Sequence, residues 1–148
     1  MPKPPEKSLR ARALDALSRR EHSRMELMRK LAPHTDNPDD LTTLLDDLQT
    51  RGWLSDARFA EQVVNVRQSR YGSRKLAFEL REKGVAEDLI NATLVNLRDT
   101  ELERARAVWE RKFGQIPASA QEKAKQIRFL QSRGFVWEVI RKILGTIE

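Results

Sequence analysis

Apolar residues recur along the chain with the three- to four-residue spacing of amphipathic helices. Leucines fill positions i, i+3, i+4 and i+7 of the stretch 41–48, and a similar stripe covers 139–144. Glycine and proline, six of each, fall between such stretches. No segment shows a convincing strand pattern. The spacing predicts nine helices, at 9–20, 23–32, 38–51, 56–70, 73–83, 86–98, 100–113, 117–133 and 135–145.

Residues at the edges of these segments support the helix limits. Side chains that cap helix starts are predicted at Ser23, at Asn37, at Ser55 or Asp56, at Ser73 and at Thr100. Two of them, Ser23 and Thr100, have a glutamate three residues later, which is the spacing of a capping box. Glycines that end helices are predicted at Gly52, Gly84, Gly114 and Gly134.

One phrase recurs in the second half of the chain. "LREKGVAEDLINATL" begins at Leu80, and "LQSRGFVWEVIRKIL" begins at Leu130. A diverged copy, "ELMRKL", begins at Glu26 and aligns with "ELREKG" at Glu79. The nine helices therefore fall into three groups of three. We predict an all-α fold of three tandem three-helix repeats that forms an elongated, curved array, with repeats at 9–55, 56–99 and 100–148 after a flexible tail at 1–8.

The composition narrows the class of protein. Of 148 residues, 39% are hydrophobic and 34% are charged, which suits modest cores under a large solvated surface. There is no cysteine, so disulfides and thiolate chemistry are excluded. The chain lacks a long apolar run and begins without an apolar signal core, so we expect a cytoplasmic protein with no membrane partner.

Signatures of catalysis are nearly absent. The two histidines, His22 and His34, are both expected on the surface. No glycine-rich loop could cradle a phosphate, and the acidic residues near Asp36–Asp47 lack the ligand spacing of a calcium loop. We therefore predict a protein without catalytic residues, bound metal or cofactor.

Positive charge increases along the chain. The net charge of +6 is distributed as zero over residues 1–56, +2 over 57–99 and +4 over 100–148. Lys30, Lys83 and Arg133 occupy the same place in each repeat, so an array would present them in a row. Such a row could follow a nucleic-acid backbone or the groove of a protein filament, or it could simply be a solvated face.

Aromatic residues are predicted to serve mainly as core. Most fall on apolar stripes, namely Trp53, Phe59, Trp109, Phe113, Phe129, Phe135 and Trp137. Tyr71 lies in a turn between Arg70 and Gly72 and is the best candidate for an exposed ring.

The phrases, taken in order, resemble the RecX family of bacterial RecA regulators. The matching stretches are "LSRREHSRMELMRKL", "LQTRGWLSDARFAEQVV", "GSRKLAFELREKGV", "WERKFG" and "IRFLQSRGF", and the likeness covers about Ala13 to Leu144. Leu31 departs from the glycine expected after Lys30, and Trp53 stands where tyrosine is commoner. The resemblance implies a non-enzyme that docks in the helical groove of the RecA nucleoprotein filament. It also implies inhibition of RecA's recombinase, ATPase and coprotease activities.

Exposed basic residues are our candidates for contact with the filament. They are Lys30, Arg67, Arg70, Arg74, Lys75, Arg81, Lys83, Arg128, Arg133, Arg141 and Lys142. The sequence does not separate residues that contact RecA from residues that contact phosphate. We expect a monomer that binds DNA directly only weakly or within the filament.

A second interpretation is a freestanding DNA-binding protein, either nonspecific or of the helix-turn-helix type. Short helices separated by glycine turns fit such units. Against it, no helix begins with the cluster of arginine, asparagine and glutamine residues that reads base edges. A metal-dependent hydrolase is disfavoured because ligands are lacking.

Overall fold

The computed structural model describes residues 7–145, and these fold into helices alone. The α-helices are α1 (Leu9–Arg19), α2 (Arg24–Leu31), α3 (Pro38–Thr50), α4 (Asp56–Arg67), α5 (Ser73–Glu82), α6 (Glu87–Leu94), α7 (Arg98–Lys112), α8 (Ala120–Ser132) and α9 (Trp137–Leu144). Two short 3-10 segments, η1 (Ala32–His34) and η2 (Val95–Leu97), follow α2 and α6. None of the described helices is both long and apolar enough to cross a bilayer. The predicted tail at 1–8 lies outside the described residues, except for Lys7 and Ser8.

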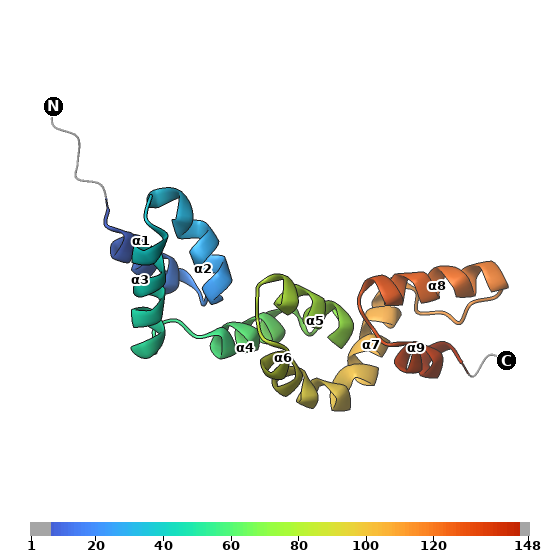
Figure 1. The fold of residues 1–148 in the computed structure, drawn as a ribbon. Helices are drawn as coiled ribbons and strands as arrows, with labels where there is room; N and C mark the ends of the chain where they lie inside the picture. Colours follow the sequence, from blue (N-terminus) through green and yellow to red (C-terminus); the bar gives the residue numbers. More distant parts are fainter. Residues whose placement is uncertain (1–6, 146–148) are drawn as a thin grey trace.

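The helices form an elongated, curved row of three-helix groups, with α1 at one end of the row and α9 at the other (Figure 1). We call α1–α3 unit one, α4–α6 unit two and α7–α9 unit three. The contacts between units one and two form the first joint, and those between units two and three form the second joint. The predicted all-α array of three-helix repeats is confirmed.

Each unit surrounds its own apolar cluster, and the repeated phrase supplies equivalent core residues. Leu80 and Ile90 are fully buried in unit two, as are Leu130 and Ile140 in unit three. Leu27, which precedes the diverged copy's "MRKL", is buried in the same way in unit one. The copies therefore repeat because each unit needs the same apolar contacts to bury its helix faces.

Several predicted caps are confirmed. The side chains of Ser23, Asn37 and Ser55 accept hydrogen bonds from first-turn backbone N–H groups at 3.1, 2.9 and 3.2 Å. The prediction for Thr100 is wrong, because the chain continues from α6 through η2 into α7 and Leu97 occupies the cap position. Ser73 is not a cap either, since it is the first residue of α5 and its hydroxyl donates to Glu101 instead.

The predicted glycine stops are confirmed. Gly52, Gly84, Gly114 and Gly134 have φ of +77°, +79°, +67° and +86°. This left-handed backbone disfavours residues that carry a Cβ, so glycine ends these helices at the least strain.

The prediction for the aromatic core is wrong at two positions. Phe59 and Phe135 are buried, but Trp53 is 46% exposed and Trp137 is 49% exposed. Trp53 stands in the turn after α3, where Arg51 covers its ring at 5.3 Å. Trp137 is the first residue of α9, so it lies at the edge of unit three rather than beneath it. Tyr71, expected to be exposed, is half-buried.

Candidate functional site

A cleft with a strongly basic lining lies at the second joint. It has a volume of about 470 Å³ and is lined by Arg70, Tyr71, Val108, Arg111, Lys112, Phe129 and Arg133. Four of these residues carry positive charge and none is acidic. We call this the basic cleft.

Direct backbone contacts between units two and three fix the position of the basic cleft. The Gly72 N–H donates to the Arg133 carbonyl at 2.7 Å, and the Arg74 N–H donates to the Gly134 carbonyl at 3.0 Å. A Cβ on Gly72 would lie 2.5 Å from the carbonyl oxygen of Gly134, so only glycine permits this approach. The contact holds Tyr71 on one side of the cleft against Arg133 on the other.

Two charged side chains of α7, Arg104 and Glu101, hold the segment between α4 and α5 in place by hydrogen bonds. The guanidinium of Arg104 donates to the carbonyls of Gln68 at 2.8 Å and Tyr71 at 3.0 Å, and its burial lowers the pKa of Arg104 below the ordinary value. The buried carboxylate of Glu101 accepts from the Ser73 backbone N–H at 2.8 Å and from its hydroxyl at 2.9 Å. These bonds attach the segment between α4 and α5 to α7.

Aromatic rings help to orient the cations around the basic cleft, and of these cations Arg67 also pairs with Glu79 at 2.7 Å. The Tyr71 ring has three positive groups over it, with the charged centre 4.5 Å from the ring centroid for Arg67, 5.2 Å for Lys75 and 5.4 Å for Arg133. The Phe129 ring has Arg133 at 5.1 Å and Lys112 at 5.4 Å. Each such contact stabilises a cation by about 0.5–1 kcal/mol at an exposed site, without neutralising it.

The cations of the basic cleft take no part in the ion pairs formed among the described residues. In units one and two many cations face carboxylates, as in Arg20–Glu26, Arg24–Asp46, Arg51–Asp47, Arg58–Glu21 and Arg67–Glu79. Within the described chain, Arg70, Arg111, Lys112 and Arg133 form no ion pair. Their charge is therefore available to an anionic partner.

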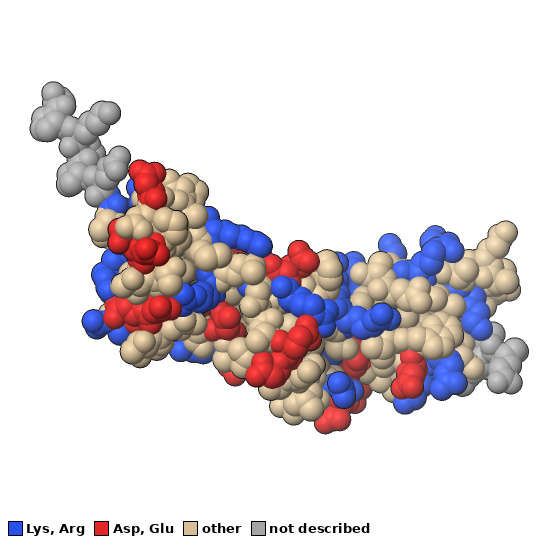
Figure 2. All heavy atoms as spheres, in the orientation of Figure 1, with Lys and Arg blue, Asp and Glu red and all other residues tan. Residues whose placement is uncertain are grey.

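The charge map of one face agrees with this distribution (Figure 2). On this face, acidic side chains lie over the end of the molecule that carries α1 and α3 and over the middle around α4–α6, whereas basic side chains predominate toward α7–α9. The pattern matches the rise in net charge along the sequence.

The structure brings together four of the predicted contact residues and separates the others. Arg67, Arg70, Lys75 and Arg133 surround Tyr71 at the basic cleft. Arg74 and Lys142 line a different cleft at the same joint. The remaining predicted residues are dispersed over the three units: Lys30, Arg81, Lys83, Arg128 and Arg141.

The three cations that share a repeat position have different surroundings. Lys30 is exposed near Arg12 and Arg19 in unit one. Lys83 lies 3.5 Å from Glu26, and Arg133 lies over the two rings of the basic cleft. Arg81 is paired with Glu87, whereas Arg128 and Arg141 are exposed on α8 and α9.

Sequence reasoning missed Arg111 and Lys112 as residues of the basic cleft. Both lie in the last turn of α7, and Arg111 donates to the Ser69 carbonyl at 3.1 Å. The signal that would have found them is a pair of cations directly before Phe113, whose ring packs edge-on against Phe129 at 5.4 Å.

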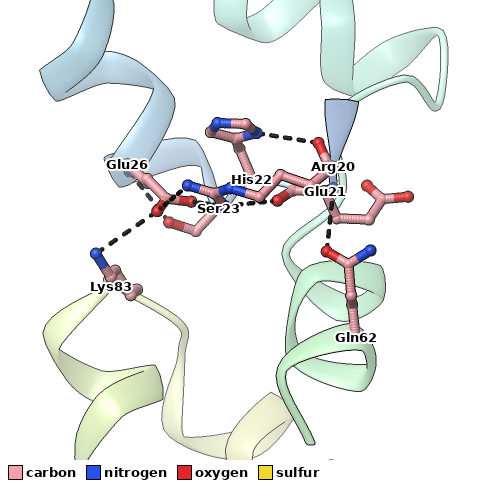
Figure 3. Close-up of polar contacts among 7 residues, drawn as sticks. All are labelled: Arg20, Glu21, His22, Ser23, Glu26, Gln62 and Lys83. Carbon is pink, nitrogen blue, oxygen red and sulfur yellow. Dashed lines mark hydrogen bonds and ion pairs between the residues drawn. The ribbon is translucent and has the colours of Figure 1, made fainter. Parts of the chain in front are cut away.

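The first joint is built from paired side chains (Figure 3). Within unit one, the two terminal guanidinium nitrogens of Arg20 donate to Glu26 at 2.9 and 2.8 Å, and across the joint the ammonium of Lys83 lies 3.5 Å from the same carboxylate. Burial acts to raise the pKa of Glu26, but the hydrogen bonds from Arg20 and the nearby positive charges of Arg20 and Lys83 together hold that pKa below its ordinary value. The Glu21 N–H also donates to Gln62 at 3.2 Å. All these groups already have hydrogen-bond or ion-pair partners within the protein.

The prediction of an exposed His22 is wrong. Only 2% of His22 is exposed, because the turn between α1 and α2 directs the ring into unit one. Its Nδ1 lies 3.0 Å from the Arg20 carbonyl oxygen, its Nε2 has no protein partner, and burial lowers the pKa of His22. Within residues 7–145, no group of three or more histidine and carboxylate side chains could hold a metal ion.

Relatives of the chain are found over nearly its whole length. The family model for the second three-helix domain of RecX matches residues 55–94, and that for the third three-helix domain matches residues 99–144. Regulatory protein RecX of Leptothrix cholodnii is 52% identical over 140 residues, which cover 95% of this chain and 89% of that protein. The chain belongs to the RecX family. The resemblance predicted from the repeated phrases is confirmed.

Other RecX proteins extend this likeness. Regulatory protein RecX of Ralstonia nicotianae is 50% identical over 137 residues, covering 93% of this chain and 86% of that protein. The crystal structure of RecX from Lactobacillus salivarius superimposes with a TM-score of 0.80 and covers 94% of both chains. Its sequence identity of 18% makes it evidence for the RecX fold alone.

Proposed function

We propose that this RecX-family chain is a monomeric regulator that lies in the helical groove of the RecA nucleoprotein filament. There it inhibits the recombinase, ATPase and coprotease activities of RecA without chemistry of its own. The observation that carries the proposal is the basic cleft, where four cations without ion pairs meet in a member of a regulatory family.

The charge distribution suits a large anionic partner. Cations that keep their charge and are held in place by rings attract an anionic surface over distances of about 10 Å, the Debye length at 0.1 M salt. The groove of a filament of protein and DNA offers both carboxylates and phosphates. The second joint is internally bonded through backbone, so the cations of the basic cleft need little rearrangement on binding.

An elongated row of units also suits a helical groove. Units along the row contact successive protomers, so the chain bridges neighbouring protomers and opposes their rearrangement. It also occupies space that incoming duplex DNA needs. Inhibition therefore results from occupancy, and no cofactor takes part.

The test is a titration of the protein into DNA-stimulated ATP hydrolysis by RecA. We expect hydrolysis to fall at less than one chain per RecA protomer. Hydrolysis and filament length that stay constant over a broad titration would contradict the function.

A charge reversal then locates the contact surface. Lys112→Glu in the basic cleft should raise the concentration needed for half-inhibition about tenfold, the effect of about 1.4 kcal/mol from one lost charge-assisted contact. Arg29→Glu, an exposed residue of α2 in unit one, makes the same change of net charge and is the matched control. Equal inhibition by the two variants would remove the basic cleft from the contact surface.

A further inference from the structure

A second cleft opens at the second joint and shares no residue with the basic cleft. It has a volume of about 650 Å³, within the range of about 300–1,000 Å³ typical of small-ligand sites. Residues of α5, α6, α7 and α9 line it, and its apolar surface comes from Ala77, Ile90, Leu94, Leu102, Val136 and Val139. We call it the Trp137 cleft.

Trp137 at this cleft differs from the other two tryptophans of the chain. Trp109 donates its indole N–H to Gln126 at 2.8 Å, and Trp53 has the guanidinium of Arg51 over its ring. Trp137 is 49% exposed, and within the described chain it has neither a hydrogen bond from its indole nor a cation over its face. Its ring therefore offers a free aromatic face at the edge of an apolar cleft.

The same cleft has a surplus of positive charge. Arg74, Arg98 and Lys142 line it, and none of their side chains forms an ion pair with a described residue. Of the two carboxylates present, Glu101 is buried and already bonded to Ser73. Only the exposed Glu138 remains to oppose the three cations.

A ligand for this cleft must combine a flat ring with an anionic group. An acidic peptide would satisfy the cations but leave the indole face and the apolar surface in water. A nucleobase stacks on an aromatic side chain, with about 1–3 kcal/mol per base, and a phosphate accepts charge-assisted bonds from arginine and lysine. The exposed amide of Asn91, which also lines the cleft, can hydrogen-bond the edge of a base.

We propose that the Trp137 cleft binds a nucleotide, with its base against Trp137 and its phosphate held by Arg74, Arg98 and Lys142. The nucleotide belongs either to a single DNA strand or to the free pool, since both offer the same base and phosphate. The site needs neither RecA nor the basic cleft, so it is independent of the function proposed above.

Binding of a 5′-fluorescein-labelled strand of ten thymidines, followed by fluorescence anisotropy without RecA, tests the proposal. Trp137→Ala should weaken binding about tenfold, as expected for the loss of one stacked base. Trp53→Ala is the matched control, because it removes a tryptophan of nearly equal exposure from unit one, and it should bind like the unaltered protein. Trp137→Phe should restore most of the affinity, because phenylalanine can also stack on a base. Trp137→Leu should not, because leucine fills a similar space without an aromatic face.

Competition separates the two sources of the nucleotide. Displacement of the labelled strand by AMP at the same nucleotide concentration as unlabelled strand indicates a free nucleotide, whereas displacement by the strand alone indicates DNA. Lys142→Ala should reduce the salt dependence of strand binding by about 0.7 in the log–log slope.

Four outcomes would overturn the proposal. They are no binding by the unaltered protein, no greater loss of affinity in Trp137→Ala than in Trp53→Ala, equal rescue by phenylalanine and leucine at position 137, and displacement of the labelled strand by inorganic phosphate at the concentration at which AMP or unlabelled strand displaces it. In the last case the base contributes nothing. Circular dichroism of each variant establishes that it is folded.

Discussion

The two joints of this molecule are held together by different kinds of contact. The first joint uses side-chain contacts, in which Lys83 faces Glu26 at 3.5 Å and Arg58 faces Glu21 at 2.9 Å. The second joint uses backbone hydrogen bonds from Gly72 and Arg74, reinforced by the buried groups of α7.

The difference determines which units move together. Exposed ion pairs contribute about 0–1 kcal/mol each and weaken with salt, whereas backbone bonds between close-packed loops tolerate little change in geometry. We therefore expect units two and three to move as one body that keeps both clefts in shape, with unit one attached to it more loosely. We expect the ligand sites to lie on the rigid body and the adaptable contact to lie at the first joint.

The largest expected effect comes from a methyl group in the second joint. In Gly134→Ala the new Cβ would overlap the backbone nitrogen and Cβ of Lys75, and residue 134 has a left-handed backbone. Strain and overlap together should lower the free energy of unfolding by about 3 kcal/mol. Urea denaturation followed by circular dichroism measures this loss.

Gly52→Ala is the matched control for that variant. Gly52 has a similar φ, of +77°, but a Cβ there would have no atom within 4 Å. The variant should therefore lose only the left-handed strain, about 1 kcal/mol. Equal losses in the two variants would show that the close approach of units two and three contributes nothing.

An intermediate effect is expected from pH, next to the first joint. Burial lowers the pKa of His22, so the unfolded chain takes up a proton near the ordinary pKa of 6.5 while the folded chain does so only at lower pH. The contribution of neutral His22 to the free energy of unfolding is therefore fully present above pH 6.5 and is lost as the pH falls below that value. Urea midpoints measured between pH 8 and pH 5 should decline less in His22→Gln. The exposed residue His34 provides the control, and a similar change of profile in His34→Gln would refute the role of His22.

The smallest expected effect lies in the first joint itself. Lys83→Ala removes an ion pair whose lysine is half-exposed and whose carboxylate, on Glu26, keeps its hydrogen bonds to Arg20, so the free energy of unfolding should change by less than about 1 kcal/mol. The difference between the variant and the unaltered protein should vanish in 1 M salt, where screening acts within about 3 Å. A loss as large as that in Gly134→Ala would contradict the distinction between the two joints.

Local features of the fold could be predicted because they depend on neighbours in the sequence. The leucine stripe of α3, the caps at Ser23 and Ser55, and the turn at Gly134 each depend on residues within one or two helical turns. His22 and Trp137 were placed wrongly because the burial of a residue at a helix start depends on how the helices of its own unit pack around it. Helical spacing contains no information about that packing.

The candidate site was predictable only in part for the same reason. The positive charge of Arg70 and Arg133 was evident from the sequence, but not that both would meet at Tyr71 across a joint. That meeting requires the backbone contact through Gly72, which joins residues 61 positions apart. Arg81 and Lys83 pair with Glu87 and Glu26, so their charge is partly neutralised within the protein. This pairing likewise depends on how the chain packs.

Arg133 takes part both in the basic cleft and in the backbone contact of the second joint. Its carbonyl accepts the bond that closes the second joint, while its guanidinium stands in the basic cleft. A ligand that contacts this guanidinium together with the rest of the basic cleft binds only when units two and three are docked on each other. By thermodynamic linkage, such binding stabilises the docked arrangement. The bound protein would thus be more rigid at the second joint than the free protein.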